Sequence, residues 1–227
     1  MYQVIFNSGF IGFLIWLLLF AVSTAGLAIA IRCGWILRKR LFINAGSHGE
    51  IIPLLKRGDW QGAFERCEAD SSLVGRILKE ILLSAHEKTS AERQEIAAGM
   101  LDRRVKEVLR QINTLAMCGN IAPMLGLLGT VTGMVDAFMG LGTTMGPEKA
   151  SVLAIAISQA LYTTATGLLV AIPAITYTVI FRNTLEKRIE LVTDMLEQAL
   201  SHIPELEPEP KPERKAYHNT ETAKLEV

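Results

Sequence analysis

Six polar side chains fall close together in a long apolar stretch, residues 150–181, that contains no charged residue. They are Ser158, Gln159, Tyr162, Thr163, Thr164 and Thr166. Polar groups at this depth in a membrane helix usually line a cavity or form hydrogen bonds to another helix. The chemistry alone therefore leaves two roles open, which are lining a hydrated ion pathway and joining two helices.

The positions of these side chains around a helix separate them into groups. At about 100° per residue, four of them share a face about 100° wide. These four are Ser158, Gln159, Tyr162 and Thr166. Thr164 and Gln159 differ by about 140° around the helix, so they do not both point straight at one axis.

Asp136 is the only charged residue in a second apolar stretch, residues 111–147. It lies in the outer half of this stretch, about one turn away in depth from Gln159. An acid at the outer mouth of a pore would attract cations. The alternative is that Asp136 pairs with Lys149 or with amides of the loop between the two stretches.

Small residues recur in the same stretch at alternating steps of four and three, in a series that Asp136 completes. They are Ala122, Gly126, Gly129, Gly133 and Gly140. Residues at these steps occupy one face of a helix. In lipid, a face of small residues lets two helix backbones approach closely. We therefore predict that the four glycines pack this helix against a partner.

Three apolar stretches are long enough to form membrane spans, because the hydrocarbon core needs about 20 apolar residues in a helix. The first covers most of residues 1–31, which carry no charged side chain. The sequence thus predicts an all-α integral membrane protein with three transmembrane helices. The predicted segments are an external N-terminus at 1–9, spans at 10–37, 112–141 and 151–181, a cytoplasmic helical region at 38–111, an external loop at 142–150, a cytoplasmic amphipathic helix at 182–203 and a disordered tail at 204–227.

Basic residues set the predicted orientation. They follow the first stretch, at Arg32, Arg38, Lys39 and Arg40, and a signal peptide would carry them in front of it. Basic residues also follow the third stretch, at Arg182, Lys187 and Arg188. By the positive-inside rule, the N-terminus lies outside and the C-terminus lies inside.

Two of the membrane helices are predicted to continue into the cytoplasm. Thr89 and Glu92 have the spacing of a capping box, which marks a helix start, and apolar residues recur at helical steps from there to the second span. One helix of about 75 Å would run from Ser90 to Leu141. Beyond the third span, Leu185, Ile189, Val192, Leu196 and Ala199 form an apolar stripe. Its partner is predicted to be the long helix before the second span or a neighbouring subunit.

Composition and motifs favour neither nucleic-acid binding nor catalysis nor secondary transport. The 23 basic and 23 acidic residues cancel, so charge does not suggest a nucleic-acid partner. Three cysteines and four histidines have no ligand spacing, and we predict packing roles for the cysteines, no metal site and no cofactor. No nucleophile–base pair or phosphate loop suggests an enzyme, and no internal repeat suggests a secondary transporter.

Two motifs resemble those of the ExbB/TolQ/MotA family of proton-driven membrane proteins. The sequence from Ala122 to Gly133, APMLGLLGTVTG, resembles the second-span motif of ExbB and TolQ. Ala160-Leu161, Thr164, Gly167-Leu168 and Ala171-Ile172-Pro173-Ala174 resemble their third-span motif. Three spans resemble ExbB and TolQ more than MotA, which has four.

The resemblance implies a homopentamer in the bacterial inner membrane. Its second and third spans would surround an ExbD/TolR-like single-span partner that supplies a protonatable aspartate. Inward proton flow would drive work on a TonB/TolA-like protein that spans the periplasm. The pore threonines carried over from the family are Thr130 and Thr164.

The chain departs from the family at Gln159, where ExbB and TolQ usually carry a glutamate. An amide cannot change charge, so this side chain cannot accept a proton. Three hypotheses follow: the partner's aspartate alone titrates while Gln159 hydrates the pore, the acidic role has moved to Asp136, or the assembly is a non-conducting scaffold.

Overall fold

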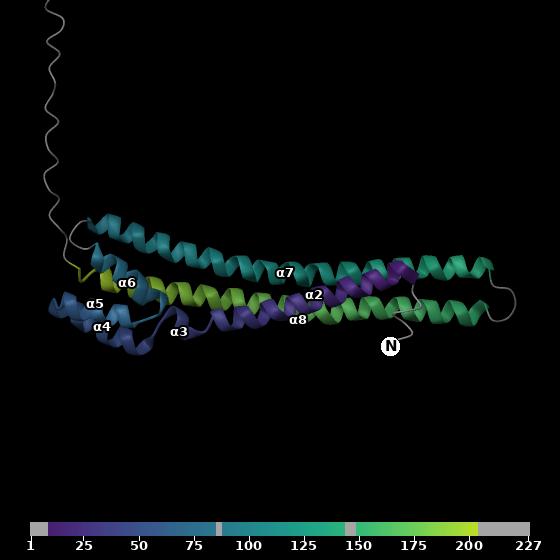
Figure 1. The fold of residues 1–227 in the computed structure, drawn as a ribbon, viewed down its shortest axis with the longest axis horizontal. Coiled ribbons are helices and arrows are strands. Elements are labelled where there is room, and N and C mark those ends of the chain that lie inside the picture. The colour runs from purple at the N-terminus through teal and green to yellow at the C-terminus, as the bar shows by residue number, and fades with distance from the viewer. Residues whose placement is uncertain (1–8, 85–87, 144–148, 204–227) are drawn as a thin grey trace, which may run out of the picture.

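The computed structural model describes residues 9–84, 88–143 and 149–203, and their regular structure is helical throughout (Figure 1). The helices are α2 (Gly9–Ile36), α3 (Lys39–Phe42), α4 (Ala45–Arg57), α5 (Trp60–Ala69), α6 (Leu73–Leu83), α7 (Ser90–Thr143) and α8 (Lys149–Leu200). The predicted tail at 204–227, most of the predicted loop at 142–150 and nearly all of the predicted N-terminal segment at 1–9 lie outside the described residues.

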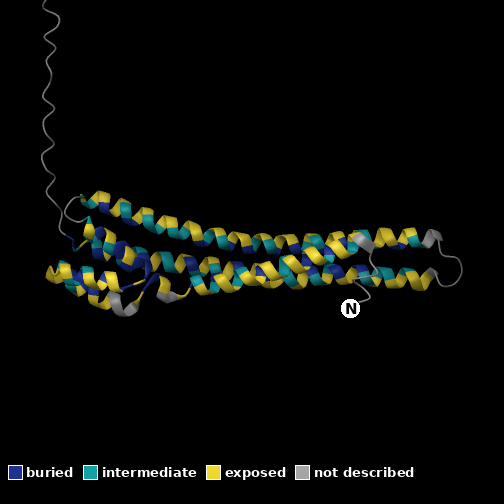
Figure 2. Ribbon diagram, in the orientation of Figure 1, coloured by how far each residue is buried: buried dark blue, intermediate teal, exposed yellow. Residues whose placement is uncertain are grey.

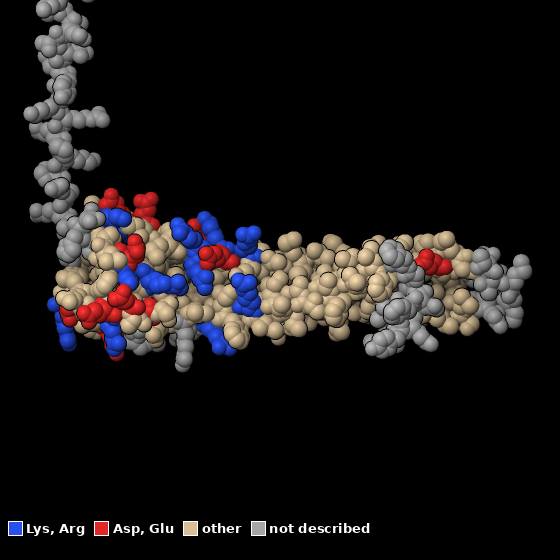
Figure 3. Space-filling view, in the orientation of Figure 1, with Lys and Arg blue, Asp and Glu red and all other residues tan. Residues whose placement is uncertain are grey.

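Three helices, α2, α7 and α8, are long and apolar enough to cross a membrane. The helices α7 and α8 run side by side along the length of the molecule, and the shorter α2 lies beside their middle part (Figure 1). Charged side chains gather at one end, which we call the charged end, and a broad band without charge separates them from the opposite, distal end (Figure 3). This distribution is that of a membrane protein, because an uncharged band is what the bilayer core requires.

The helices α7 and α8 extend well beyond their apolar segments. They have 54 and 52 residues, so each is about 80 Å long. The predicted capping box at the start of α7 is confirmed. The Thr89 amide donates to the Glu92 carboxylate at 2.9 Å, and the Glu92 amide donates to the Thr89 hydroxyl at 3.4 Å. The first of these bonds lowers the pKa of Glu92 from its ordinary value.

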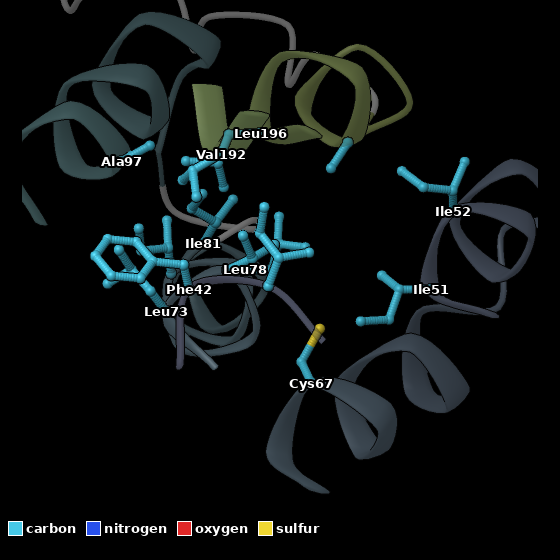
Figure 4. Packing of buried hydrophobic residues seen from close by; sticks show 14 of the residues in the cluster. Phe42, Ile51, Ile52, Cys67, Leu73, Leu78, Ile81, Ala97, Val192 and Leu196 are labelled. Carbon is cyan, nitrogen blue, oxygen red and sulfur yellow. The ribbon is translucent and has the colours of Figure 1, made fainter. Parts of the chain in front are cut away.

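The hydrophobic core lies at the charged end, where the short helices α4, α5 and α6 pack beside α8 and the start of α7 (Figure 4). The apolar stripe of α8 points into this core, with Val192, Leu196 and Ala199 buried. Its partners come from the same chain and include Ile77 of α6 and Val108 of α7. The prediction that this stripe packs on an apolar partner is confirmed.

Local capping explains where the short helices start and stop. Gly58 adopts φ = 75° at the end of α4, a left-handed conformation that glycine reaches without strain. Asp59 then caps α5, because its carboxylate accepts the Gly62 amide at 2.9 Å. The chain therefore reverses within two residues, which brings α4 and α5 together.

A buried polar turn caps the start of α6. The Asp70 carboxylate accepts both the amide and the hydroxyl of Ser72, each at 2.9 Å. The Ser72 hydroxyl in turn accepts the Gly75 amide at 3.2 Å. A Cβ atom on Gly75 would lie 2.8 Å from the Asp70 carbonyl oxygen, so only glycine fits this turn.

The three cysteines are free thiols, and two of them are buried. Cys67 lies in the core of the charged end near Ile51 (Figure 4). Burial raises the pKa of the Cys67 thiol to about 12, and the nearby Asp70 carboxylate contributes in the same direction. The positions of Cys33 and Cys67 confirm the prediction that they are packing residues.

Candidate functional site

The membrane parts of α7 and α8 meet along a seam of small residues. A Cβ atom on Gly126 would lie 2.9 Å from the Thr163 carbonyl oxygen and 3.0 Å from the Thr164 Cα atom. A Cβ atom on Gly167 of α8 would lie 2.6 Å from the Ala122 carbonyl oxygen. Each of these contacts is with backbone, which cannot move aside cheaply. The two backbones are thus in direct contact, the arrangement that small residues permit in membranes.

Three of the four predicted packing glycines, Gly126, Gly129 and Gly133, closely face α8, and Gly140 does not. Gly129 faces the Thr163 side chain, whose Oγ1 atom would lie 2.5 Å from an added Cβ, and Gly133 faces Ala160 at 2.9 Å. A Cβ atom on Gly140 would meet no described atom within 4 Å. The close contact therefore ends between Gly133 and Gly140, toward the distal end.

Two threonine hydroxyls join the helices at the closest point of the seam. Thr164 donates to the Gly126 carbonyl oxygen at 2.9 Å, and Thr163 approaches the same oxygen at 3.2 Å. Thr163 also lies 2.7 Å from the carbonyl oxygen of Ala160 in its own helix. Each hydroxyl oxygen keeps lone pairs that can accept a further hydrogen bond. Thr163 and Thr164 therefore link α7 to α8 within one chain.

Thr130 is buried on α7, in the same region as the seam. Its hydroxyl donates to the Leu127 carbonyl oxygen at 2.7 Å, one turn earlier in the helix. The side chain is therefore turned along its own helix and does not hydrogen-bond to α8. Its oxygen, like that of Thr164, still has accepting capacity.

Three other polar residues of α8, Ser158, Tyr162 and Thr166, lie on a different face. Ser158 is nine positions from Gly167, which places it about 180° away from the seam around α8. Ser158 and Tyr162 are exposed on the isolated chain, Tyr162 by 60%. Thr166 is partly exposed and donates to the Tyr162 carbonyl oxygen at 2.8 Å. Ser158, Tyr162 and Thr166 thus form an outward polar face, separate from the threonine pair at the seam.

A cavity of about 520 Å³ opens beside the distal part of the seam. Side chains of α2, α7 and α8 line it, among them Asp136, Gln159 and Thr163. The structure thereby brings Asp136 and Gln159, which are far apart in sequence, to one polar space within a single chain. Asp136 is exposed and supplies the only carboxylate of this lining.

Two polar residues of this cavity were not predicted as site residues. Thr132 lies one turn before Asp136 on α7, and Trp16 reaches the cavity from α2. The Trp16 Nε1 atom is buried and has no hydrogen-bond partner among the described residues. The spacing of Thr132 and Asp136 could have identified the first. Nothing in the sequence pairs Trp16 with α7, because their contact depends on how the spans pack.

A polar contact at the other limit of the apolar band also joins the long helices. The Arg182 guanidinium of α8 donates to the Asn113 amide oxygen of α7 at 3.2 Å. The seam is therefore bounded by a polar pair toward the charged end and by the cavity toward the distal end. No group of three or more His, Cys, Asp or Glu side chains in the described ranges could hold a metal ion.

Comparison with known proteins identifies relatives of this helix pair. Residues 69–198 match the model of the MotA/TolQ/ExbB proton channel family. The biopolymer transport protein exbB1 of Vibrio cholerae is 38% identical over 95 residues, which are 42% of this chain and 42% of that protein. ExbB of Pseudomonas putida is 32% identical over 160 residues, 67% of this chain and 48% of that protein. ExbB of Neisseria meningitidis is 28% identical over 216 residues, 88% of this chain and 93% of that protein.

The chain thus spans 42% and 48% of the length of the first two of these relatives. The family match begins at the end of α5 and runs nearly to the end of α8, so it contains the seam, Asp136 and Gln159. Three apolar helices and relatives named ExbB are consistent with the bacterial inner membrane, and the resemblance read from the two motifs is confirmed. The chain belongs to the MotA/TolQ/ExbB proton channel family, as an ExbB-like member.

Proposed function

We propose that this chain is the channel-forming stator subunit of a proton-driven machine in the bacterial inner membrane. In this proposal it forms a homopentamer with its N-terminus outside and its C-terminus in the cytoplasm, and α7 and α8 project from the membrane on the cytoplasmic side. The pentamer surrounds an ExbD/TolR-like single-span partner whose aspartate carries the protons. The basic residues that follow the apolar segments of α2 and α8 support this orientation.

One observation carries the proposal. At the seam, Gly126, Gly167 and the threonine pair make their contacts within one chain. Ser158 and Tyr162 nevertheless remain exposed on the opposite side of α8. Exposed polar groups in a membrane span are costly in lipid and commonly face a protein interior or water. A ring of copies would gather these faces around a common hydrated axis, beside which the partner's aspartate can be protonated and released.

The force output follows from the same arrangement. A proton that crosses 100 mV releases about 2.3 kcal/mol, so a working cycle needs several protons. The rigid α7–α8 pair would transmit the resulting movement, and a TonB/TolA-like protein would carry it across the periplasm. Biopolymer transport, the activity in the names of the relatives, is the process that we propose for the complex.

Gln159 favours a second candidate, a non-conducting pentameric scaffold of the same fold. Its amide lines the distal cavity but cannot gain or lose a proton at physiological pH. In the conducting proposal, Gln159 holds water while the partner's aspartate titrates. In the scaffold, no side chain replaces the missing carboxylate at position 159, so protons have no complete path through the pentamer.

Proton flux distinguishes the two candidates. The full chain and its single-span partner are reconstituted into vesicles that enclose a pH-sensitive dye, and a potassium diffusion potential drives protons inward. The channel proposal expects acidification that requires both proteins and disappears when the partner's aspartate is changed to asparagine. Flux equal to that of empty vesicles would reject the channel and leave the scaffold.

A further inference from the structure

A second hollow lies at the opposite limit of the apolar band, where α2 ends. It has a volume of about 750 Å³ and is lined by the last two turns of α2 and the start of α3. Three large apolar side chains in its lining are exposed: Ile31 by 55%, Trp35 by 63% and Leu41 by 42%. The described chain therefore leaves an apolar wall uncovered at this point.

Two guanidinium groups border the same wall. Arg32 and Arg38 both belong to the lining, and the Cζ atom of Arg38 stands 5.2 Å from the centre of the Trp35 ring. Among the residues that the structure describes, no carboxylate lines the hollow and neither arginine forms an ion pair with an acid. The site thus combines uncovered apolar surface with two positive charges that the described chain does not neutralise.

The position of this hollow limits what can fill it. Arg32 is the first charged residue of the chain, so it marks the point where the apolar span of α2 gives way to charge. Lys and Arg side chains are concentrated where the uncharged band meets the charged end (Figure 3). A molecule in the hollow would therefore meet hydrocarbon on one side and the headgroup layer on the other.

We propose that this hollow binds an anionic glycerophospholipid. Its phosphate diester accepts hydrogen bonds from the Arg32 and Arg38 guanidinium groups, which suit phosphate geometry. One acyl chain lies along Ile31 and Leu41, and the Trp35 ring sits at the headgroup level, as tryptophan does at membrane interfaces. A choline lipid fits less well, because no acid in the hollow offers a partner to its quaternary ammonium.

This proposal does not depend on proton conduction, so the two can fail separately. It requires only that the spans lie in a bilayer. Basic sites beside membrane helices attract anionic headgroups by about 1 kcal/mol per charge, which corresponds to about fivefold in affinity. The two arginines together predict a preference of about 25-fold for an anionic over a zwitterionic lipid with the same acyl chains.

Quenching of Trp35 fluorescence tests this preference. The full chain with Trp16→Phe and Trp60→Phe keeps Trp35 as its only tryptophan. It is reconstituted into phosphatidylcholine vesicles, and phosphatidylglycerol with brominated acyl chains is titrated against phosphatidylcholine with the same brominated chains. We expect half-maximal quenching at a mole fraction of the anionic lipid about 25-fold lower than that of the choline lipid.

Arginine substitutions then separate a built site from general attraction to the surface. Arg32→Gln and Arg38→Gln should each reduce the preference about fivefold, whereas the matched control Arg103→Gln, an exposed arginine on α7, should leave it unchanged. Native mass spectrometry of the unsubstituted chain, with the lipids it retains through detergent exchange, gives a second readout that needs no tryptophan variant. It should show bound phosphatidylglycerol in preference to phosphatidylcholine.

Three results would overturn the proposal. The first is equal quenching by the two brominated lipids. The second is a loss of lipid preference in Arg103→Gln as large as in Arg32→Gln or Arg38→Gln, which would mean only diffuse attraction to the surface. The third is protection of Trp35 from both lipids, which would mean that a second copy of the chain covers the hollow.

Discussion

The sequence left two roles open for Thr163 and Thr164, which are joining two helices and lining a hydrated pathway. Both hydroxyls lie within hydrogen-bond distance of the Gly126 carbonyl oxygen, so their immediate task is to join α7 to α8. Their oxygen lone pairs remain available, and a water molecule or partner carboxyl that donates a hydrogen bond could use them. At this scale, helix joining and pore lining are compatible functions of the same side chain.

Asp136 is the single carboxylate of the distal cavity, and its proposed role at a pore mouth can be tested directly. Asp136→Asn keeps the size of the side chain and removes its charge. If the carboxylate concentrates cations, we expect proton flux in reconstituted vesicles to fall about tenfold at low salt. The loss should shrink at 1 M salt, where the screening length is only about 3 Å.

Asp136→Glu serves as the control for this measurement, because it retains the charge and should retain most of the flux. The alternative role, pairing with Lys149 or with loop amides, predicts lower stability of Asp136→Asn with no change in flux. Full flux at every salt concentration would reject the mouth role.

Cys67 should be an unreactive thiol. Only the thiolate is a nucleophile, and a pKa of about 12 instead of the ordinary 9.0 leaves about a thousandfold less thiolate at pH 8. We therefore expect iodoacetamide to modify Cys67 at least a thousandfold more slowly in the folded chain than in urea. The measurement uses a Cys33→Ala, Cys118→Ala chain and mass spectrometry of the alkylated product. Comparable rates in the two states would show that the thiol is not buried.

At the level of elements, the central feature is that α7 and α8 approach until backbone touches backbone. Gly126 and Gly167 make this possible, because a Cβ atom on either would overlap main-chain atoms of the other helix. The same approach brings the Thr164 hydroxyl within hydrogen-bond reach of α7. Packing and polar contacts at the seam therefore depend on one another.

Matched alanine substitutions test this dependence. Gly126→Ala places a methyl group against Thr163 and Thr164 backbone, and we expect it to destabilise the chain by about 1–3 kcal/mol. Gly140→Ala meets no described atom within 4 Å and should be neutral or slightly stabilising, since alanine favours helix by about 1 kcal/mol over glycine. Thermal unfolding in one detergent measures both variants. Equal midpoints for the two would contradict the seam.

At the scale of the whole molecule, the membrane surface of the isolated chain is mostly apolar and exposed (Figure 2). Leu161 and Tyr162 are adjacent on α8 and exposed to nearly the same extent, 62% and 60%. They point in directions about 100° apart. If copies of the chain enclose a hydrated axis at the polar face, Tyr162 meets water there while Leu161 meets lipid or a neighbouring subunit.

Cysteine labelling separates these environments. In a chain that lacks the three natural cysteines, Tyr162→Cys should react with a water-soluble maleimide in membranes, at least tenfold faster than Leu161→Cys. The physical reason is that thiolate formation and the reagent both require water. Labelling of Ser158→Cys, on the same face as Tyr162, should follow Tyr162→Cys. Equal and slow labelling at all three positions would mean that this face has no aqueous access.

Some helix boundaries at the charged end could be predicted, because they depend on residues close together in the chain. Thr89 and Glu92 form the predicted capping box, and Gly58-Asp59 breaks the chain between α4 and α5 where turn chemistry indicates. The amphipathic stripe of α8 was likewise visible as a helical repeat. The long helix α7 was one of the two partners predicted for this stripe. The contribution of α6 was not predicted, since the repeat specifies an apolar face and leaves its neighbours open.

The candidate site was predictable only in part, for the same reason. Gly126, Asp136 and Gln159 could be selected by type and spacing within single helices. The cavity that joins Asp136 to Gln159 and adds Trp16 could not, because each of the three side chains comes from a different helix. The two motifs of the membrane helices sufficed for the family, which the comparisons confirm.

The sequence by itself determined the three apolar helices, the capping box at the start of α7 and the family, because hydropathy, capping and motif spacing are properties of neighbouring residues. The tertiary structure alone decided that the glycine face of α7 closes on α8 of the same chain, and that Thr163 and Thr164 share one backbone acceptor. The physical reason is that a small-residue face is complementary to any close backbone. Which backbone occupies it is settled by how the helices fit together along their whole length.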